Sequence, residues 1–284
     1  MATNSLKFNL GAASARRNLA ATGRAMNRSI QRLSSGLKVN TSSDDAANMA
    51  ISVTNRASIS SHKRALQNAQ DAIGLMQTTE GGIHAIQDLL VRMRELAVQG
   101  ATDTLNLPAR KALEKEFQTH SSELDRIFRV TEYNGIQLLD GLTDYKPEGR
   151  SFLIDDKPGP AGTIKVELDF SKIFTTIQNN TVNGVHNLKN LENSQNMITV
   201  VDKLTDTLQG QRVKVGSTIN RLEVATDNLM QTIENEQNSL SVRVDTDLAS
   251  ESAEFTKNQV LMQAGVAMLA QANSAPNILL RLLN

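Results

Sequence analysis

Apolar residues recur at steps of three, four and seven near both ends of the chain. This spacing places a narrow apolar seam along one side of a helix, as in a coiled coil. It predicts a seamed helix at each end of the chain. The front seam consists of Met26, Ile30, Leu33 and Leu37, and the rear seam consists of Val244, Leu248, Phe255, Met262, Val266 and Leu269.

Helical signals continue inward from both ends. Residues 5–33 are predicted to form the first helix, which Ser34-Ser35-Gly36 ends. A second long helix is predicted from Asp44 to about Gln99, with Ser42 or Ser43 as its N-cap. Gly81-Gly82 interrupts its pattern and is expected to mark a bend or a weak point.

The middle of the chain combines a shorter helix with β-structure. A helix is predicted from Leu107-Pro108 to about Phe128, followed by a turn at Asn134-Gly135. Residues 151–154 and 163–170 are predicted strands, because apolar and polar residues alternate in the second one. A third long helix begins by about Ser194. The pattern therefore predicts a mainly α fold, in which a long antiparallel helical bundle or coiled coil is built from both chain ends and carries a small β-hairpin insert.

Charge is distributed unevenly although it balances over the 284 residues, at 30 basic and 30 acidic side chains. The first 43 residues contain seven basic residues and no acidic one, whereas the last 40 have an acidic bias. Because the two seamed helices have opposite charge bias, we predict that the two terminal helices pack against each other. No apolar run approaches a membrane span of roughly 18 residues, and no secretory signal peptide is expected. The acid-free start also resembles a mitochondrial transit peptide, but it continues the helical pattern.

Candidate chemistry is sparse. The chain has no cysteine, which excludes disulfides, thiolate metal sites and cysteine nucleophiles. The four histidines are not spaced as a helical metal pair, and the spacing of His120 and Glu123 alone is a weak metal signal. Asp44-Asp45 is better explained by helix capping than by metal binding. We therefore expect no catalytic, cofactor or metal site and no enzymatic activity.

Several longer strings resemble one protein family. Residues 29–52, SIQRLSSGLKVNTSSDDAANMAIS, resemble the N-terminal signature of bacterial flagellins, which continues with NAQDAIGLMQTTE, LLVRMRELAVQ and TEYNGIQLL. The second half resembles the C-terminal signature in GSTINRL at residues 216–222 and in TKNQVLMQAGVAMLAQAN at residues 256–273. The resemblance covers both ends in order and leaves only about residues 141–190 outside it.

The resemblance implies a structural subunit that polymerises into the bacterial flagellar filament for motility. Such a subunit is extracellular and is exported by the flagellar type III secretion apparatus without a cleaved signal peptide. The implied partners are other copies of the chain, a flagellar export chaperone at the C-terminus, and the filament cap and junction proteins. No nucleic acid, membrane insertion or cofactor is implied. The candidates for packing between subunits are Met26, Ile30, Leu33, Leu37, Val244, Leu248, Phe255, Met262 and Leu269.

Two alternative functions remain. A hook–filament junction protein shares the end signatures, and a chemoreceptor-like helical signalling module shares the heptads, although the β insert and the terminal leucines argue against the latter. The flagellin resemblance implies an inner coiled-coil domain of residues 1–42 with 244–284. It also implies an outer helical core of residues 43–140 with 177–243, and a hairpin insert of residues 141–176 that would lie outermost.

The resemblance also marks a candidate surface for immune recognition. Arg92, Leu96 and Glu116 align with the flagellin motif that is bound by the flagellin-sensing Toll-like receptor. Arg92 and Leu96 are four residues apart and share one helix face. Leu89 and Leu96 are expected to form an apolar stripe that the chain's own core leaves uncovered. This stripe would pack against a neighbouring subunit or would bind the receptor.

Overall fold

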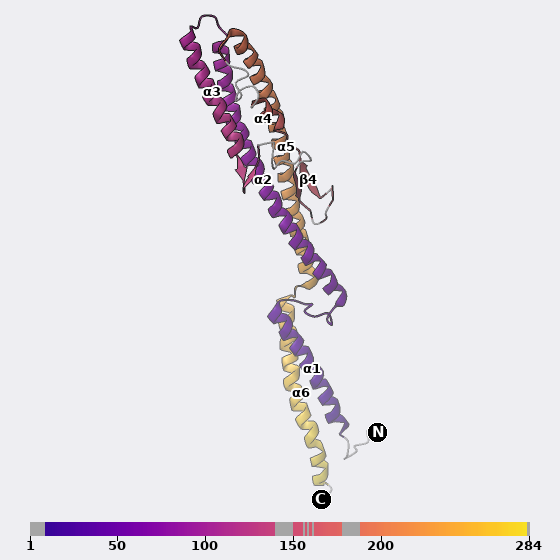
Figure 1. Ribbon diagram of the computed structural model, residues 1–284. Coiled ribbons are helices and arrows are strands. Elements are labelled where there is room, and N and C mark those ends of the chain that lie inside the picture. The colour runs from indigo at the N-terminus through magenta and orange to yellow at the C-terminus, as the bar shows by residue number, and fades with distance from the viewer. Residues whose placement is uncertain are drawn as a thin grey trace. The chain divides into compact units, whose positions relative to one another are not determined.

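The computed structural model describes residues 9–139, 150–155, 157, 159–160, 162–177 and 188–282, with side chains described as far as Ser274. It is mainly helical, with two short antiparallel strand pairs in the middle of the chain (Figure 1). The predicted fold class is therefore confirmed. Contacts divide the chain into two compact units: unit 1 comprises residues 1–59 and 234–284, and unit 2 comprises residues 60–233. The division falls within two long helices, not in the linkers near residues 42 and 244.

Unit 1 is built around the two terminal helices. Helix α1 (Leu10–Ser35) and helix α6 (Leu248–Leu282) run antiparallel, side by side (Figure 1). Asn9 caps α1, and its side-chain amide donates to the carbonyl of Ala272 at 2.7 Å. At the other end of the pair, the backbone N–H of Thr246 donates to the carbonyl of Gly36 at 2.9 Å. The predicted pairing of the termini is confirmed.

The second helix, α2 (Ala46–Gly100), begins at an aspartate cap. The Asp45 carboxylate accepts from the backbone N–H of Asn48 at 2.9 Å, which satisfies one free donor of the first helical turn. The prediction of Ser42 or Ser43 as the cap is wrong. Both serines belong to the preceding turn, which is closed by a hydrogen bond from the Asp44 N–H to the Thr41 carbonyl.

In unit 2, α2 continues through Gly81-Gly82 as one helix. The expectation of a bend or a weak point there stays a prediction. Helix α3 (Leu107–Val130) starts as predicted, with Asn106 as its cap and Pro108 in its first turn. Strands β1 (Glu132–Tyr133) and β2 (Ile136–Gln137) form a hairpin. Its turn, Asn134-Gly135, has positive φ at both residues, as a type I′ turn requires.

The predicted insert forms a second hairpin. Strand β3 (Arg150–Leu153) pairs antiparallel with β4 (Thr163–Val166), so the second strand ends four residues before Phe170. A short helix, α4 (Ser171–Ile177), follows. The hairpin lies along the sides of α2 and α5, where the Asn68 amide donates to the Leu153 carbonyl at 3.3 Å. The end of this unit is formed by the turn between α2 and α3 (Figure 1). The placement of the hairpin outermost in an assembly stays a prediction.

The hydrophobic core lies in unit 2. It joins α2, α3, the insert and helix α5 (Leu191–Val244), and every member of the buried cluster falls between residues 72 and 222. The rings of Phe128 and Phe174 meet in it at a centroid distance of 6.0 Å. Helix α5 contributes a buried stripe of Met197, Val201, Leu204, Leu208, Val215 and Leu222. Unit 2 therefore contains most of the buried apolar area that stabilises a fold.

Candidate assembly surface

The contact between α1 and α6 follows a heptad on each helix. Buried or half-buried residues recur at alternating steps of three and four on both sides of the contact. On α1 they are Ala12, Ala15, Leu19, Thr22, Met26, Ser29 and Leu33. On α6 they are Glu251, Phe255, Asn258, Met262, Gly265, Leu269 and Ala272. The pair is thus a short two-stranded antiparallel coiled coil.

Glycines let the two helices approach closely. A Cβ atom on Gly265 would lie 2.8 Å from a Leu19 δ-methyl carbon, and one on Gly23 would lie 3.3 Å from the terminal methyl of Met262. Each helix therefore places a long apolar side chain over a glycine of the other. This reciprocal fit fixes the antiparallel register of the pair.

Polar residues also take part in this contact. Arg32 and Glu251 form an ion pair at 3.5 Å across the two helices. Asn258 is 6% exposed, and its amide nitrogen has no hydrogen-bond partner among the described residues. A buried asparagine in a coiled-coil seam costs stability but disfavours other registers.

The predicted seam residues divide between this contact and the surface. Val244 is buried, and Met26, Leu33, Leu37, Phe255, Met262 and Leu269 are half-buried. Ile30, Leu248 and Val266 are instead 45%, 56% and 53% exposed, because the observed heptad passes through Ser29, Glu251 and Gly265. These three apolar residues therefore lie outside the intrachain seam, and the role of Ile30 and Leu248 in packing between subunits stays a prediction.

Helix α6 presents an apolar outer face. Residues 258–274 contain no charged side chain, and Val260, Leu261, Val266 and Met268 are 46% to 65% exposed. One neighbour, α1, covers only one side of α6. The exposed side also carries Gln259, Gln263 and Gln271, so it is uncharged and mixes large apolar residues with amides. Exposed apolar side chains gathered in this way are typical of a protein interface.

The second predicted surface, on α2 and α3, is only partly exposed. Arg92 donates to Glu116 at 2.6 Å and to Glu95 at 2.9 Å. The hydrogen bond from Arg92 is the main reason that the pKa of Glu116 is lowered. Leu96, however, is 1% exposed and belongs to the core.

The expectation of an uncovered Leu89–Leu96 stripe is therefore wrong. Helix α2 forms ion pairs on two sides, from Arg92 to α3 and from Arg94 to Asp202 of α5. Because both α3 and α5 pack on α2, the buried face of α2 is wider than the single seam that was predicted.

Neither a metal-binding cluster nor a membrane-spanning helix is formed by the part of the chain that the structure describes. It contains no group of three or more His, Cys, Asp or Glu residues placed to hold a metal ion. No helix within the described ranges is long and apolar enough to span a membrane.

Comparison with known proteins gives matches at both ends. Residues 7–144 match the family described as bacterial flagellin N-terminal helical region, and residues 198–283 match the bacterial flagellin C-terminal helical region. A flagellin of Halalkalibacterium halodurans is 36% identical over 278 residues, with 98% of this chain and 99% of the relative covered. A flagellin of Bacillus subtilis is 32% identical over 301 residues, with the same coverage.

A solved structure supports the fold. The putative flagellar hook-associated protein from Vibrio parahaemolyticus aligns with a TM-score of 0.59 at 13% identity, over 71% of this chain and 99% of that one. At this identity the likeness concerns the fold alone. The family matches span both ends of the chain, and the relatives match it over nearly its whole length. The chain therefore belongs to the bacterial flagellins and is a structural subunit, not an enzyme, that polymerises into the flagellar filament for motility.

Proposed function

We propose that this flagellin polymerises chiefly through the outer faces of α1 and α6. The observation that carries the proposal is the uncharged stretch of α6, residues 258–274, with its exposed large apolar side chains. In a polymer, α6 helices from neighbouring copies would cover one another and remove this area from water. Ile30 and Leu248 would join that contact, since both are exposed on the single chain.

The assignment of domains follows from the same proposal. Residues 1–42 and 244–284 would form the inner part of the filament wall, where apolar helices from many copies meet. Residues 43–140 and 177–243 would form an outer helical layer with its own core, and the insert of residues 141–176 would lie against that layer.

Substitution of one exposed residue tests the assembly proposal. Met268 is 65% exposed, so Met268→Glu should leave the monomer folded but should prevent or strongly retard filament growth. The control is Met268→Leu, which keeps the apolar surface and should polymerise. Growth is followed by light scattering and electron microscopy. Normal filaments from Met268→Glu would refute a role for this face.

The same apolar face suggests a need for protection before export. We infer that a cytoplasmic export chaperone binds the C-terminal helix, and that the chain leaves through the flagellar type III secretion apparatus and is added beneath the cap, beyond the junction proteins. Exposed apolar helices aggregate unless they are covered. Calorimetry of the cognate chaperone with the full chain, compared with Leu261→Glu, tests this step. Equal affinity for both chains would count against it.

Receptor recognition remains a proposal for Arg92 and Glu116 only. Both side chains are more than 40% exposed, whereas Leu96 is too deeply buried to contact a receptor directly. A guanidinium held by two carboxylates is a plausible specific anchor for a protein partner. Reporter-cell activation by wild-type monomer should therefore exceed activation by Arg92→Ala and Glu116→Ala monomers. Lys115→Ala, on the same helix as Glu116, is the control. Equal signals from all four would exclude this surface.

A further inference from the structure

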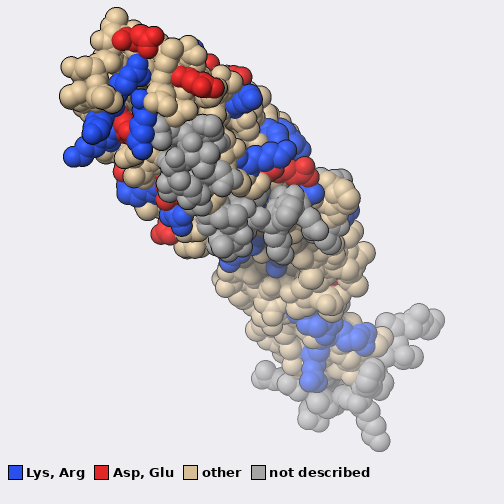
Figure 2. Space-filling view, turned by 45° about the horizontal axis from the view of Figure 1, so that its top comes forward, with Lys and Arg blue, Asp and Glu red and all other residues tan. Residues whose placement is uncertain are grey.

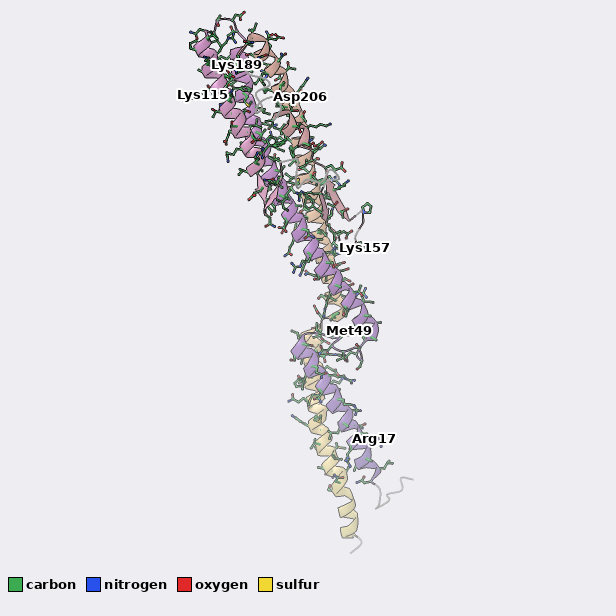
Figure 3. All side chains as sticks on the ribbon, in the orientation of Figure 1. Arg17, Met49, Lys115, Lys157, Lys189 and Asp206 are labelled. Carbon is green, nitrogen blue, oxygen red and sulfur yellow. The ribbon has the colours of Figure 1, made fainter. Side chains whose placement is uncertain are left out.

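Helix α1 carries a basic stripe that has no ion-pair partner among the described residues. All charged residues of α1 are arginines, and Arg32 is paired with Glu251. Arg17, Arg24 and Arg28 are exposed and form no ion pair within the described ranges. Steps of seven and four place these three within about 40° of one another around the helix. Figure 2 shows basic side chains gathered without acidic ones near the lower end of the view, and Figure 3 labels Arg17 on α1.

The second half of α5 carries an acidic stripe of the same length. Glu223, Asp227 and Glu234 are exposed and form no ion pair with any other described residue. Steps of four and seven again place them within about 40° around the helix. Met230, 48% exposed, lies in the same stripe, and the nearest basic residue, Arg221, lies on the opposite side of the helix. The stripe therefore offers three carboxylates with one apolar residue between them.

The two stripes match when the helices run antiparallel. The basic stripe has steps of seven and four, and the acidic stripe, taken backwards along the chain, has the same steps. Ala21, which is small and exposed, then faces the longer Met230. The resulting pairs are Arg17 with Glu234, Arg24 with Asp227, and Arg28 with Glu223.

We propose that α1 of one flagellin copy docks antiparallel on residues 223–234 of α5 in a neighbouring copy. This inference rests on the assembly proposed above and adds a polar contact to it. A second copy is the partner because the same chain supplies both stripes with matching steps and opposite charge. Nucleic acid fits less well, since no aromatic side chain interleaves with the arginines to stack on bases.

Such a contact would determine the relative orientation of the two helices more than the strength of their binding. Exposed ion pairs contribute little individually, but three in one register disfavour shifted or parallel arrangements. Each subunit in a polymer would make the contact twice, once through α1 and once through α5. A single charge reversal therefore weakens two contacts per subunit.

Charge reversal with rescue tests the proposal on the full chain. Arg24→Glu and Asp227→Arg should each raise the critical concentration for filament growth about fivefold, and the two together should return it to within about twofold of wild type. Arg16→Glu is the matched control. It changes the net charge equally, but Arg16 lies about 100° away from the stripe. The effect should shrink in 1 M salt, where surface charges are screened.

Crosslinking identifies the neighbour directly, because the chain has no native cysteine. Filaments grown from equal amounts of Arg24→Cys and Asp227→Cys chains should give disulfide-linked dimers on mild oxidation. Filaments that contain Arg24→Cys with Asp206→Cys should not, since Asp206 lies on α5 outside the stripe (Figure 3).

The outcomes separate this inference from the assembly proposal. Rescue by the double reversal together with interchain dimers supports the contact. Filaments that form normally in all variants, without a crosslink, overturn it while leaving polymerisation intact. A chain with both cysteines that gives only intrachain disulfides also overturns it. Failure of the wild-type chain to polymerise would instead contradict the assembly proposal itself.

Discussion

Two adjacent glycines in α2 have different environments. A Cβ atom on Gly82 would lie 2.9 Å from side-chain carbons of Leu139 and Thr131, whereas one on Gly81 would meet nothing within 4 Å. Thr131 cannot move freely, because its hydroxyl donates to the Ile127 carbonyl at 2.7 Å. Gly82 is thus required for the β1–β2 hairpin to approach α2, while Gly81 is not.

This difference predicts opposite effects of alanine. Gly82→Ala should lower the free energy of unfolding by about 1–3 kcal/mol through overpacking. Gly81→Ala should raise it by about 0.5–1 kcal/mol, because alanine loses less backbone entropy in a helix. Thermal unfolding followed by circular dichroism measures both, with wild type as the reference. Stabilisation by both substitutions would show that the hairpin adapts to the added methyl group.

The Asp45 cap predicts a pH dependence. The pKa of Asp45 is lowered, mainly because the Asn48 backbone N–H donates to its carboxylate. A lowered folded-state pKa gives stability that is present above the unfolded pKa, near about 4, and is lost as the pH falls through the folded pKa. The Tm difference between wild type and Asp45→Ala should therefore be largest at neutral pH and should shrink in acid. Ser43→Ala should have little effect at any pH.

Residue patterns predicted the type of structure better than the individual contacts. The start of α3 at Leu107-Pro108 and the Asn134-Gly135 turn were predicted, because proline in a first turn and positive φ depend on local chemistry. Four candidates for a cap, Ser42 to Asp45, stand together, and sequence alone could not identify Asp45 as the one used. Leu96 was assigned to the surface because the sequence does not reveal that α2 has two helical neighbours.

At the scale of elements, the α1–α6 pair depends on complementary large and small residues. Gly265 lies beneath Leu19, so a large side chain at residue 265 cannot be accommodated in the present register. Gly265→Leu should therefore weaken the pair and reduce filament yield. The double variant Gly265→Leu with Leu19→Ala, which places the large residue on α6 and the small one on α1, should recover much of the lost filament yield. Filament mass after sedimentation is the measurement, and Leu19→Ala alone is the control. Equal yields from single and double variants would contradict this packing.

The same packing explains why the seam was only partly predicted. Large apolar residues identify a seam when they point inward. Here small or polar residues occupy eight of the fourteen inner positions, among them Ala12, Ser29, Asn258 and Gly265. Ile30, Leu248 and Val266 are large, and they point outward. A search for large apolar residues therefore mixed the intrachain seam with the proposed interface between copies. Only the structure separates the two, because it shows which stripe one chain can cover by itself.

At the scale of the molecule, the two units differ in how they bury apolar area. The buried cluster lies wholly in unit 2, and its members come from α2, α3, α4, α5 and the strands. The α1–α6 pair in unit 1 has a single narrow seam that contains polar residues and glycines. A pair of this kind gains little stability from its own packing. Unit 2 should therefore determine the main unfolding transition of the monomer.

Truncation at either end tests this division of roles. Removal of residues 1–35 or of residues 250–284 deletes α1 or most of α6 and leaves every member of the buried cluster in place. Each truncated chain should be a soluble, helical monomer whose main transition lies within about 5 °C of wild type, because the core contacts of unit 2 are unchanged. Neither should form filaments, even when seeded with wild-type fragments, because the apolar face of α6 is absent or has lost its partner. Circular dichroism measures the first property and electron microscopy the second. Normal filaments from either chain would show that assembly does not depend on the α1–α6 pair. A fall in Tm well beyond about 5 °C would show that the termini stabilise the core of unit 2.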